Sequence, residues 1–479
     1  METITPPLGI IERFNRWLQE SIMVKLASIG FLMLILLIPG SWIGSIIEER
    51  QDRSSEMIRE VSDKWSGTQT LSGPILVVPY IVREVVDLGK DGKETRDHME
   101  KAYFLPQSLE VKGIVTPEVL SRGLFDAVVY QSELKMSANF TAPDFKSLSA
   151  PDDLVQWQDA YMVFGITDVR GISDSLSFRF KDNNYTAEPS SNIGVKVSAT
   201  ADATGGYPHS VTNPPTRSAV PGNGIIVKVP ATGPGDLTGK VDVALKLKGS
   251  DRLNFTPVGK STTVRIEGPW ADPSFDGEFL PESREITQTD FNAEWKVLHF
   301  NRPFPQQWKN GDESLENADF GVRLMMPVDQ YQKSMRSAKY SVLIILLTFM
   351  ALFLVEITQR IRIHPFQYIL IGAALTIYYI LLLSLSEHMG YNEAYMIASL
   401  ATVILITAYS KTFLVTRRLV SLFAGLLGVF YTFIFVIIQE QDYSLLLGSI
   451  GLFLIVALLM YFSRKVKWYN TNYELGVRN

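Results

Sequence analysis

The sequence predicts a membrane protein of the α plus β class, with six transmembrane helices and one large β-rich domain outside the membrane. One apolar, uncharged run covers residues 26–47 near the N-terminus. Five more follow in the last third of the chain, at 340–355, 366–386, 394–410, 419–438 and 443–463. A transmembrane helix needs roughly 17 to 25 such residues. The long segment between the first and second runs has the composition of a soluble domain.

Residues 1–25 are predicted to form an amphipathic helix on the cytoplasmic membrane surface. The apolar residues that recur there at helical spacing are Ile10, Ile11, Phe14, Trp17, Leu18 and Ile22. The opposite face carries Glu12, Arg13, Arg16, Gln19 and Glu20. A helix of this kind lies in the interface with its apolar side toward the lipid tails. Packing against another protein is the alternative interpretation.

The first transmembrane helix, 26–47, is predicted to remain as an anchor. It lacks a small-residue cleavage site before Trp42 and runs into the charged sequence Glu48-Glu49-Arg50, so it is not a cleaved signal peptide. The helical pattern continues outward over 48–64.

The domain at 48–339 is predicted to be mostly β. Runs rich in Val, Ile, Phe, Tyr and Thr occur at 73–86, 124–140, 161–169, 224–230, 240–250 and 262–268, with Gly, Pro, Asn and Asp between them. This spacing is typical of a sandwich or a curved antiparallel sheet. We expect a short turn at 117–121 and a loop at 200–224.

An internal echo raises the hypothesis that the domain holds two related β units. The sequence FLPQSLEV at 104–111 shares five residues in register with FLPESREI at 279–286. Each copy precedes a strand-like segment that contains aromatic residues. Duplication of a β unit and chance similarity of two strand starts both fit this pattern.

The last five spans are predicted to form a helix bundle over 340–463, followed by a tail at 464–479. Lys and Arg precede the first span, separate the second from the third and the fourth from the fifth, and follow the sixth. The other two short connections contain neither. Because short loops that carry Lys and Arg stay in the cytoplasm, both termini are predicted to be cytoplasmic and the large domain to lie outside.

Residue types that catalysis and metal binding require are scarce. The chain has no cysteine, which excludes thiolate nucleophiles and thiolate metal sites. Its five histidines are scattered, and no H-E-x-x-H, G-x-S-x-G, phosphate-binding or dinucleotide-binding motif occurs. We therefore predict a protein that is not an enzyme, with no catalytic residues, metal or cofactor. A Ser-Lys or paired-carboxylate site assembled from distant strands is the alternative.

The charge balance of the outer domain argues against nucleic acid as a partner. Its 33 Lys and Arg face 41 Asp and Glu, and an acidic domain has no electrostatic attraction for a phosphate backbone. The partners expected are the lipid bilayer and a protein or lipid-like component of the envelope.

Three ionisable residues stand at the ends of predicted spans. Glu356 ends the second span on the cytoplasmic side, and Glu387 with His388 ends the third on the outer side. Ionisable groups buried in a bilayer are usually functional. Near an interface, however, a hydrated helix end is the simpler interpretation, and a proton relay is the alternative.

Several longer sequences resemble one known family. The most distinctive are PVDQYQKSMRSAKYSVLIILLTFMALFLVEI at 327–357 and IHPFQYILIGAALTIYYILLLSLSEHMGYNEAYMIAS at 363–399. Others are LLIP at 36–39, SGP at 72–74 with VVP at 77–79, DVRGI at 168–172, and FLP at 279–281 followed by Arg284. Together they resemble the CreD family of bacterial inner-membrane proteins, also called cell envelope integrity proteins, over nearly the whole chain.

The resemblance implies a location and a process. It places the protein in the inner membrane, with the large domain in the periplasm, and associates it with envelope maintenance and the response to envelope stress and β-lactams. It implies no enzymatic activity, ligand or catalytic residue.

The topology also suggests where the domain and the bundle are coupled. Two polar segments fall at the outer membrane surface, and we hypothesise that they meet there and transmit changes between domain and bundle. Their residues are Asp329, Gln330, Tyr331, Ser386, Glu387 and His388. The alternative is that Tyr331 only anchors the second span at the interface.

Three functions follow as expectations. The first is a non-enzymatic envelope protein whose periplasmic domain binds a protein partner or a lipid-like ligand. The second is a transporter or lipid-handling protein, which would need an apolar groove that opens toward the bundle. The third is an envelope hydrolase, which would need a convergent polar site in a concave pocket.

Overall fold

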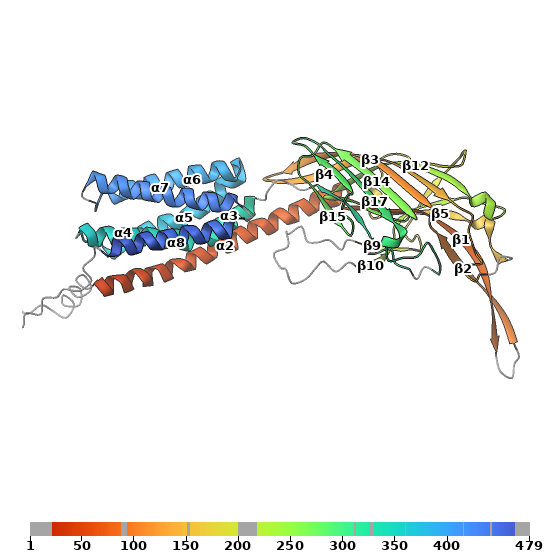
Figure 1. Cartoon of the computed structure of the whole chain (residues 1–479), viewed down its shortest axis with the longest axis horizontal. Helices are drawn as coiled ribbons and strands as arrows, with labels where there is room; N and C mark the ends of the chain where they lie inside the picture. The colour runs from red at the N-terminus through yellow and green to blue at the C-terminus, as the bar shows by residue number, and fades with distance from the viewer. Residues whose placement is uncertain are drawn as a thin grey trace, which may run out of the picture. The chain divides into compact units, whose positions relative to one another are not determined.

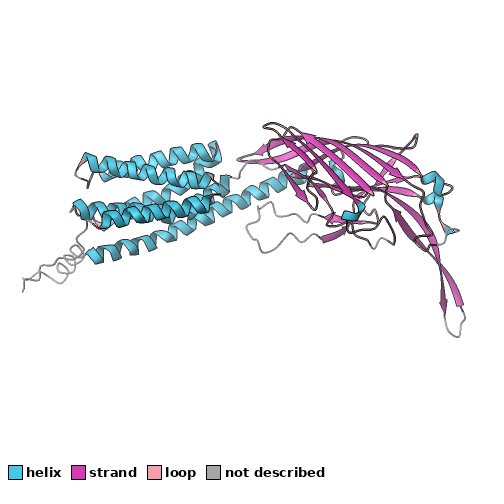
Figure 2. Ribbon diagram, viewed as in Figure 1, coloured by secondary structure: helices cyan, strands magenta, loops and turns pink. Residues whose placement is uncertain are grey.

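The computed structural model describes residues 22–87, 93–150, 154–199, 218–310, 313–324, 330–359, 361–414, 416–440 and 443–464. The chain divides into two compact units. A helical unit comprises Met1–Asp52 and Val328–Asn479, and a β unit comprises Arg53–Pro327. Helices fill the first and strands the second (Figures 1 and 2). The helix predicted at 1–25 and the tail predicted at 464–479 lie almost entirely outside the described residues.

The first long helix, α2 (Ile22–Trp65), covers both the predicted first span and the helical continuation predicted after it. Its buried apolar residues within the helical unit, Ile29, Leu36, Ile43 and Ile47, recur at intervals of seven or four and therefore share one face. The other face exposes large apolar side chains such as Phe31 and Trp42. That exposure is expected where a helix contacts lipid.

The remaining helices of the helical unit follow one another closely in the chain. They are α3 (Gln330–Lys339), α4 (Ser341–Gln359), α5 (Pro365–Met389), α6 (Tyr391–Ser410), α7 (Arg417–Gln439) and α8 (Ser444–Ser463). Over the described residues, α2 and α4 to α7 are long and apolar enough to cross a membrane, and the described apolar stretch of α8 is Leu446–Leu458. The structure thus has a helix at each of the six predicted spans, five of which qualify as spans over their described residues, and the short polar helix α3 precedes the second.

Local sequence explains how α5 begins and how α2 approaches it. The backbone N–H of Phe366 donates to His364 Nδ1 at 3.2 Å, and that of His364 donates to Gln367 Oε1 at 2.9 Å, which forms a capping box ahead of Pro365. Further along, a Cβ at Gly372 would lie only 2.2 Å from Leu36 Cδ1. Glycine at this position lets α2 and α5 pack closely, as small residues do between membrane helices.

The β unit consists of two large sheets and a separate hairpin. The nine-stranded sheet runs β15 (Pro273–Gly277), β19 (Phe320–Leu324), β13 (Arg252–Thr256), β1 (Gln69–Asp87), β5 (Tyr161–Ile166), β11 (Gly224–Lys228) and β8 (Ala187–Ser190), with β2 (Lys93–Phe104) and β18 (Gln307–Lys309) off this path. The eight-stranded sheet runs β16 (Ser283–Ile286), β17 (Phe291–Leu298), β14 (Ser261–Gly268), β3 (Ser108–Arg122), β4 (Phe125–Phe140), β12 (Gly239–Ser250), β6 (Ser177–Phe180) and β7 (Asn183–Tyr185). The hairpin joins β9 (Lys196–Ala199) and β10 (Ser218–Pro221).

Alternating burial produces one continuous apolar core in the β unit. Val241, Val243, Leu245 and Leu247 of β12 are buried, and the residues between them are exposed or half-buried. The core draws such residues from both sheets and includes Trp295, which is fully buried. The strands predicted from alternation and β-branched composition are thus confirmed.

The sequence predicted a short turn and a long loop in this unit. The turn expected at 117–121 is wrong, because β3 continues to Arg122 and pairs with β4 along its whole length. The turn lies at Gly123, whose φ of +66° suits glycine in a tight hairpin. Most of the loop expected at 200–224 lies outside the described residues, and its described end begins with β10.

The strand pairing has an internal repeat. In an early set of strands, β1 and β5 lie in the nine-stranded sheet, and β3 and β4, which come between them in the chain, lie in the eight-stranded sheet. A later set has the same distribution: β13 and β19 lie in the nine-stranded sheet, and β14 and β17 lie in the eight-stranded sheet. The parallel pairs β1–β13 and β3–β14 join the two sets. The FLP echo does not follow this repeat, because one copy runs into the central strand β3 and the other into the edge strand β16. Duplication of a β unit stays a prediction.

Candidate functional site

The junction hypothesised from the sequence contains one close contact. The hydroxyl of Tyr331 on α3 donates to Glu387 Oε1 on α5 at 3.3 Å, and Arg50 Nε of α2 lies 3.8 Å from the same oxygen. Both Tyr331 and the Glu387 side chain are buried, at 3% and 7% exposure. Three helices of the helical unit therefore meet at one carboxylate.

The other residues of that hypothesis do not join this contact. Ser386 is buried, and its hydroxyl donates to the Leu383 carbonyl oxygen within the same helix. His388 is exposed, with Nδ1 3.0 Å from the carbonyl oxygen of Ser384. Gln330 is half-buried and Asp329 lies outside the described residues. The structure thus brings together Tyr331 and Glu387, and it adds Arg50, which sequence reasoning missed.

Helix α3 makes further polar contacts with α6 and α7. The hydroxyls of Ser337 and Tyr391 are hydrogen-bonded at 2.6 Å, and Lys333 Nζ donates to Gln439 Oε1 at 3.1 Å. The Lys333 ammonium also lies 5.5 Å from the centre of the Tyr391 ring. Burial and the nearby charge of Arg336 lower the pKa of Lys333. These contacts fix α3 against the ends of the membrane helices.

Five tyrosines cluster inside the bundle, and sequence reasoning counted four of them, all except Tyr391, as part of apolar runs. Tyr378 is central: its ring lies 4.8 Å from those of Tyr379 and Tyr431 and 6.0 Å from that of Tyr395, and Tyr391 adjoins Tyr395 at 5.9 Å. The Tyr395 hydroxyl donates to the backbone oxygen of Tyr431 at 2.7 Å.

Two hydroxyls of the tyrosine cluster have no hydrogen-bond partner among the residues that the structure describes. Those of Tyr379 and Tyr431 are buried without a hydrogen bond to the part of the chain that the structure describes. Unpaired polar groups in such surroundings are costly. The cluster therefore provides donors that a water or a polar ligand would satisfy. Two adjacent tyrosines in the middle of a predicted span were the signal that could have revealed it.

At the other end of the bundle, the expectation of a hydrated helix end at Glu356 is wrong. Glu356 is only 3% exposed, and its carboxylate has partners on α2, on α5 and in the connection between α4 and α5. Lys25 Nζ donates to Glu356 Oε1 at 2.6 Å, the Ile363 N–H donates to the same oxygen at 3.2 Å, and the Tyr368 hydroxyl donates to Oε2 at 3.1 Å. Sequence reasoning missed this ion pair because its partners are 331 positions apart.

Within the β unit, Asp168 fastens the end of α2 to the sheets. Its carboxylate accepts from the Ser66 hydroxyl and the Gly67 N–H, each at 3.1 Å, and from Arg170 Nε at 2.9 Å. Arg170 in turn donates to the Asp63 carbonyl oxygen in the last turn of α2 at 3.1 Å. We call Asp168 and Arg170 the α2 latch.

The electrostatics of the latch favour the ionised carboxylate. Burial alone would raise the pKa of Asp168, but the hydrogen bonds from Arg170 and the Gly67 N–H outweigh it and lower that pKa to about 2. The neighbouring Gly171 is required because a Cβ there would lie 2.4 Å from the Lys248 carbonyl oxygen. The DVRGI sequence at 168–172 is thus explained by structure.

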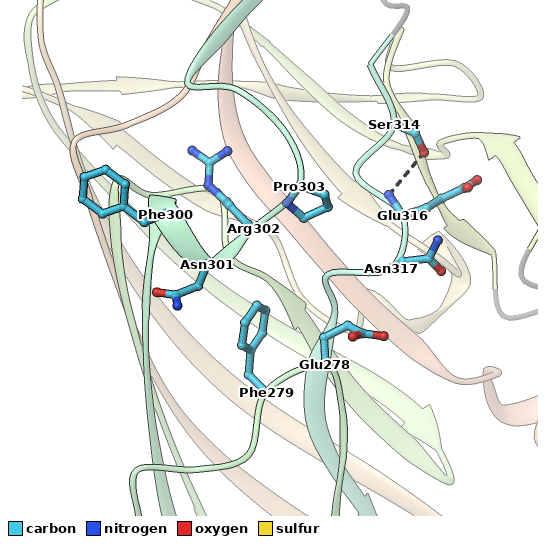
Figure 3. Close-up of a pocket in the computed structure, with 9 residues that line it drawn as sticks. All are labelled: Glu278, Phe279, Phe300, Asn301, Arg302, Pro303, Ser314, Glu316 and Asn317. Atoms are coloured by element: carbon cyan, nitrogen blue, oxygen red, sulfur yellow. Dashed lines mark hydrogen bonds between the residues drawn. The ribbon is translucent and has the colours of Figure 1, made fainter.

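The β unit also carries a pocket of about 700 Å³ beside its core (Figure 3). Its walls come from three segments: Glu278 and Phe279 after β15, residues 300–303 around η6 (His299–Asn301), and residues 314–317 before β19. Phe300 is 84% exposed at its edge. In Figure 3 the ring of Phe279 points into the space between these segments.

Two residues that line this pocket each have a buried polar atom without a partner among the described residues. Arg302 is 7% exposed and donates to the carbonyl oxygens of Phe304 and Pro305 and to the Gln306 side chain, and burial lowers its pKa to about 10. Its Nε makes no hydrogen bond within the described residues, and the same holds for the buried Glu316 Oε1. An exposed aromatic ring beside charged side chains that each keep one unpaired polar atom is suited to a polar ligand that has an apolar face.

The residues that the structure describes contain no group of three or more His, Asp or Glu able to hold a metal ion. The aromatic pocket, the tyrosine cluster and the Glu356 ion pair are the candidate sites.

The six-span bundle and its β-rich domain define a multi-pass membrane protein. The family model described as Inner membrane protein CreD matches residues 21–469 of this chain. The Inner membrane protein CreD of Escherichia coli (strain K12) is 30% identical over 455 residues, which cover 94% of this chain and 95% of the relative. The chain belongs to the CreD family of inner membrane proteins, which confirms the resemblance noted in the sequence.

Proposed function

We propose that this protein maintains the cell envelope without catalysing a reaction, and that its β unit faces the periplasm and binds an envelope component. The observation that carries this proposal is the pocket beside Phe279 and Phe300. It combines an exposed ring with unpaired polar atoms of Arg302 and Glu316. Family membership supports an inner-membrane location for such a receptor.

The chemistry of the pocket favours a glycan that carries charged or amide groups. The C–H faces of sugar rings pack against aromatic rings, and the amides of Asn301 and Asn317 suit sugar hydroxyls. Arg302 Nε is a donor for a carboxylate or a carbonyl oxygen, and Glu316 Oε1 is an acceptor. Fragments of the peptidoglycan wall combine these features.

Binding is tested on the full-length protein in lipid nanodiscs with soluble peptidoglycan fragments as the probe. We expect Phe300→Ala to weaken binding about tenfold, since aromatic anchors often contribute more than 1 kcal/mol. Met99→Ala removes a comparably exposed apolar side chain elsewhere in the β unit and should leave the dissociation constant unchanged. Equal affinity of the Phe300→Ala variant and the parent protein would refute the pocket as the binding site.

The orientation is tested with single cysteines, because the chain has none of its own. Glu133 is exposed on β4, and Lys411 is exposed between α6 and α7. A membrane-impermeant maleimide on spheroplasts should label Glu133→Cys at once, and Lys411→Cys only after permeabilisation. The reverse pattern would place the β unit in the cytoplasm.

A second function, transport or lipid handling, is favoured by the interior of the bundle. Buried charges and unpaired hydroxyls inside a membrane protein often mark a substrate path. If the tyrosine cluster forms part of one, Tyr378→Phe should lower uptake or lipid transfer in reconstituted vesicles, with protein abundance unchanged. Vesicles that show neither process with the parent protein would leave envelope binding as the function.

A further inference from the structure

The Lys25–Glu356 ion pair borders a cavity in the helical unit that the proposed function does not use. The cavity measures about 330 Å³. Basic side chains on its walls are Lys25, Arg362 and His364, the one carboxylate is Glu356, and apolar side chains include Ile29, Leu32 and Pro365. They come from the start of α2 and from the connection between α4 and α5.

The cavity has an excess of positive charge that is available to a ligand. Both oxygens of Glu356 already accept hydrogen bonds, Oε1 from Lys25 and the Ile363 N–H, and Oε2 from Tyr368. The Lys25 side chain remains 24% exposed, and its ammonium has three hydrogens to donate. Arg362 is exposed and forms no ion pair with any residue that the structure describes.

His364 adds a further donor to this end of the cavity. Its Nδ1 accepts a hydrogen bond from the Phe366 N–H as the cap of α5, so in the neutral ring the proton resides on Nε2. The positive end of the α5 dipole lies at the same place. Each of these features favours an anion.

The level of the cavity along the helices matches the boundary between lipid headgroups and tails. Lys25 directly precedes the apolar run of α2, and α5 begins at Pro365. Apolar side chains exposed on the outer surface continue from this level, namely Leu26, Phe366, Ile369 and Leu370. Charged walls and an adjoining apolar surface fit a headgroup and its acyl chains.

We propose that this cavity binds the headgroup of an acidic glycerophospholipid. The phosphodiester accepts hydrogen bonds from Lys25 and Arg362, and the acyl chains lie against Ile29, Leu32 and Phe366. Zwitterionic lipids are disfavoured because the one carboxylate on the cavity wall is already bonded, which leaves their ammonium group without an acceptor. Binding of this kind ties α2 to α4 and α5.

The test is native mass spectrometry of the full-length protein ejected from nanodiscs that contain phosphatidylethanolamine and phosphatidylglycerol at a fixed ratio. We expect the retained lipid to be enriched in phosphatidylglycerol about fivefold over the nanodisc composition. Arg362→Gln should reduce this enrichment to near the bulk ratio. Arg418→Gln removes an exposed cation at the start of α7, outside the cavity, and should leave the enrichment unchanged.

Three outcomes would overturn the proposal. The first is that the lipid retained by the parent protein follows the bulk ratio. The second is that the Arg362→Gln and Arg418→Gln variants lose the phosphatidylglycerol enrichment equally. The third is that millimolar inorganic phosphate displaces the lipid. The last would show a phosphate site without selectivity for lipid. If Arg362→Gln fails to fold, the charge-balanced pair Lys25→Gln with Glu356→Gln replaces it, and retained enrichment in that variant also counts against the site.

Discussion

The β unit and the helical unit differ in what they bury between their elements. Between the sheets the core is apolar, and the polar groups beside it include both paired ones, as in the α2 latch at Asp168, and unpaired atoms such as Arg302 Nε. The bundle encloses a carboxylate, an ammonium group and five tyrosines, and two of the tyrosine hydroxyls have no partner among the described residues.

This difference follows from the two solvents. In water, burial of apolar surface drives sheets together, so polar groups add little to the core of the β unit. In a bilayer the lipid tails are as apolar as the helices, so hydrogen bonds and close packing must select the arrangement. The polar contacts of Glu356, Tyr395 and Glu387 are therefore expected to specify how the bundle assembles.

The largest effect is expected from removing the centre of the apolar core. Trp295 is fully buried, its ring lies within 6 Å of those of Phe275 and Phe320, and its Nε1 donates to the Phe279 carbonyl oxygen at 3.1 Å. Trp295→Ala should destabilise the β unit by about 3–5 kcal/mol. Pulse proteolysis of the full-length protein in urea measures this loss, and Leu280→Ala, at an exposed residue, is the control.

The same experiment tests whether the two units are independent. Cleavage confined to peptides of 53–327, with the bundle peptides still protected, is the expected result. Equal loss of protection in both units would show that the stability of the helical unit depends on the apolar core of the β unit. The two units would then not be independent.

The next effect concerns the charge buried in the bundle. Lys25→Met leaves the Glu356 carboxylate without its cation and should lower stability by about 3 kcal/mol, the low end for a broken buried pair, since Lys25 is partly exposed. Adding Glu356→Gln should restore most of that loss. Thermal unfolding in detergent compares the single and double variants. A double variant as unstable as the single one would show that packing, and not charge, carries the effect.

The α2 latch predicts a smaller, pH-dependent effect in the β unit. The pKa of Asp168 is lowered from 3.8 to about 2, so its contribution is complete above the unfolded pKa and is lost as the pH falls from about 4 toward 2. Asp168→Asn should cost roughly 1–2 kcal/mol at neutral pH and flatten the acid limb of the stability curve.

Tryptophan fluorescence during urea unfolding at a series of pH values measures the acid limb of the stability curve. Glu133→Gln, an exposed carboxylate on β4, serves as the control and should keep the acid limb of the parent protein. An Asp168→Asn variant with an unchanged acid limb would contradict the assignment of the latch.

The helices and strands of both units could be predicted from the sequence, but the polar contacts between distant residues could not. The spans and most strands were predictable because they depend on local composition and on periods of two and 3.6 residues. Even the missed turn had a local signal, Gly123, two residues beyond the segment chosen.

The polar contacts of the candidate sites were not predictable in the same way. Lys25 and Glu356 are 331 positions apart, and Arg50 meets Glu387 across a similar gap, so no local pattern connects them. The Tyr331–Glu387 contact was foreseen only because topology placed both residues at one end of the bundle. Tyr378 and Tyr379 escaped notice because tyrosine counts as apolar in a hydropathy scan, although its hydroxyl needs a partner when buried.

The smallest expected change in stability comes from removing single tyrosine hydroxyls in the bundle, one that is hydrogen-bonded and one that is not bonded to any described residue. Tyr395→Phe removes a hydrogen bond to the Tyr431 backbone oxygen and should cost about 0.6–1.7 kcal/mol. Tyr379→Phe removes a buried hydroxyl that has no partner within the described residues, so it should be neutral or stabilising. The two substitutions delete the same hydroxyl oxygen from two rings that both adjoin Tyr378, so each variant is the control for the other.

Thermal unfolding in a single detergent measures both variants. A substantial loss from Tyr379→Phe would mean that its hydroxyl holds a water or a ligand in the membrane-embedded protein. The tyrosine cluster would then be a binding site, and the second candidate function, transport or lipid handling, would gain support. A loss confined to Tyr395→Phe would instead assign the cluster to assembly of the bundle and leave ligand binding to the β unit.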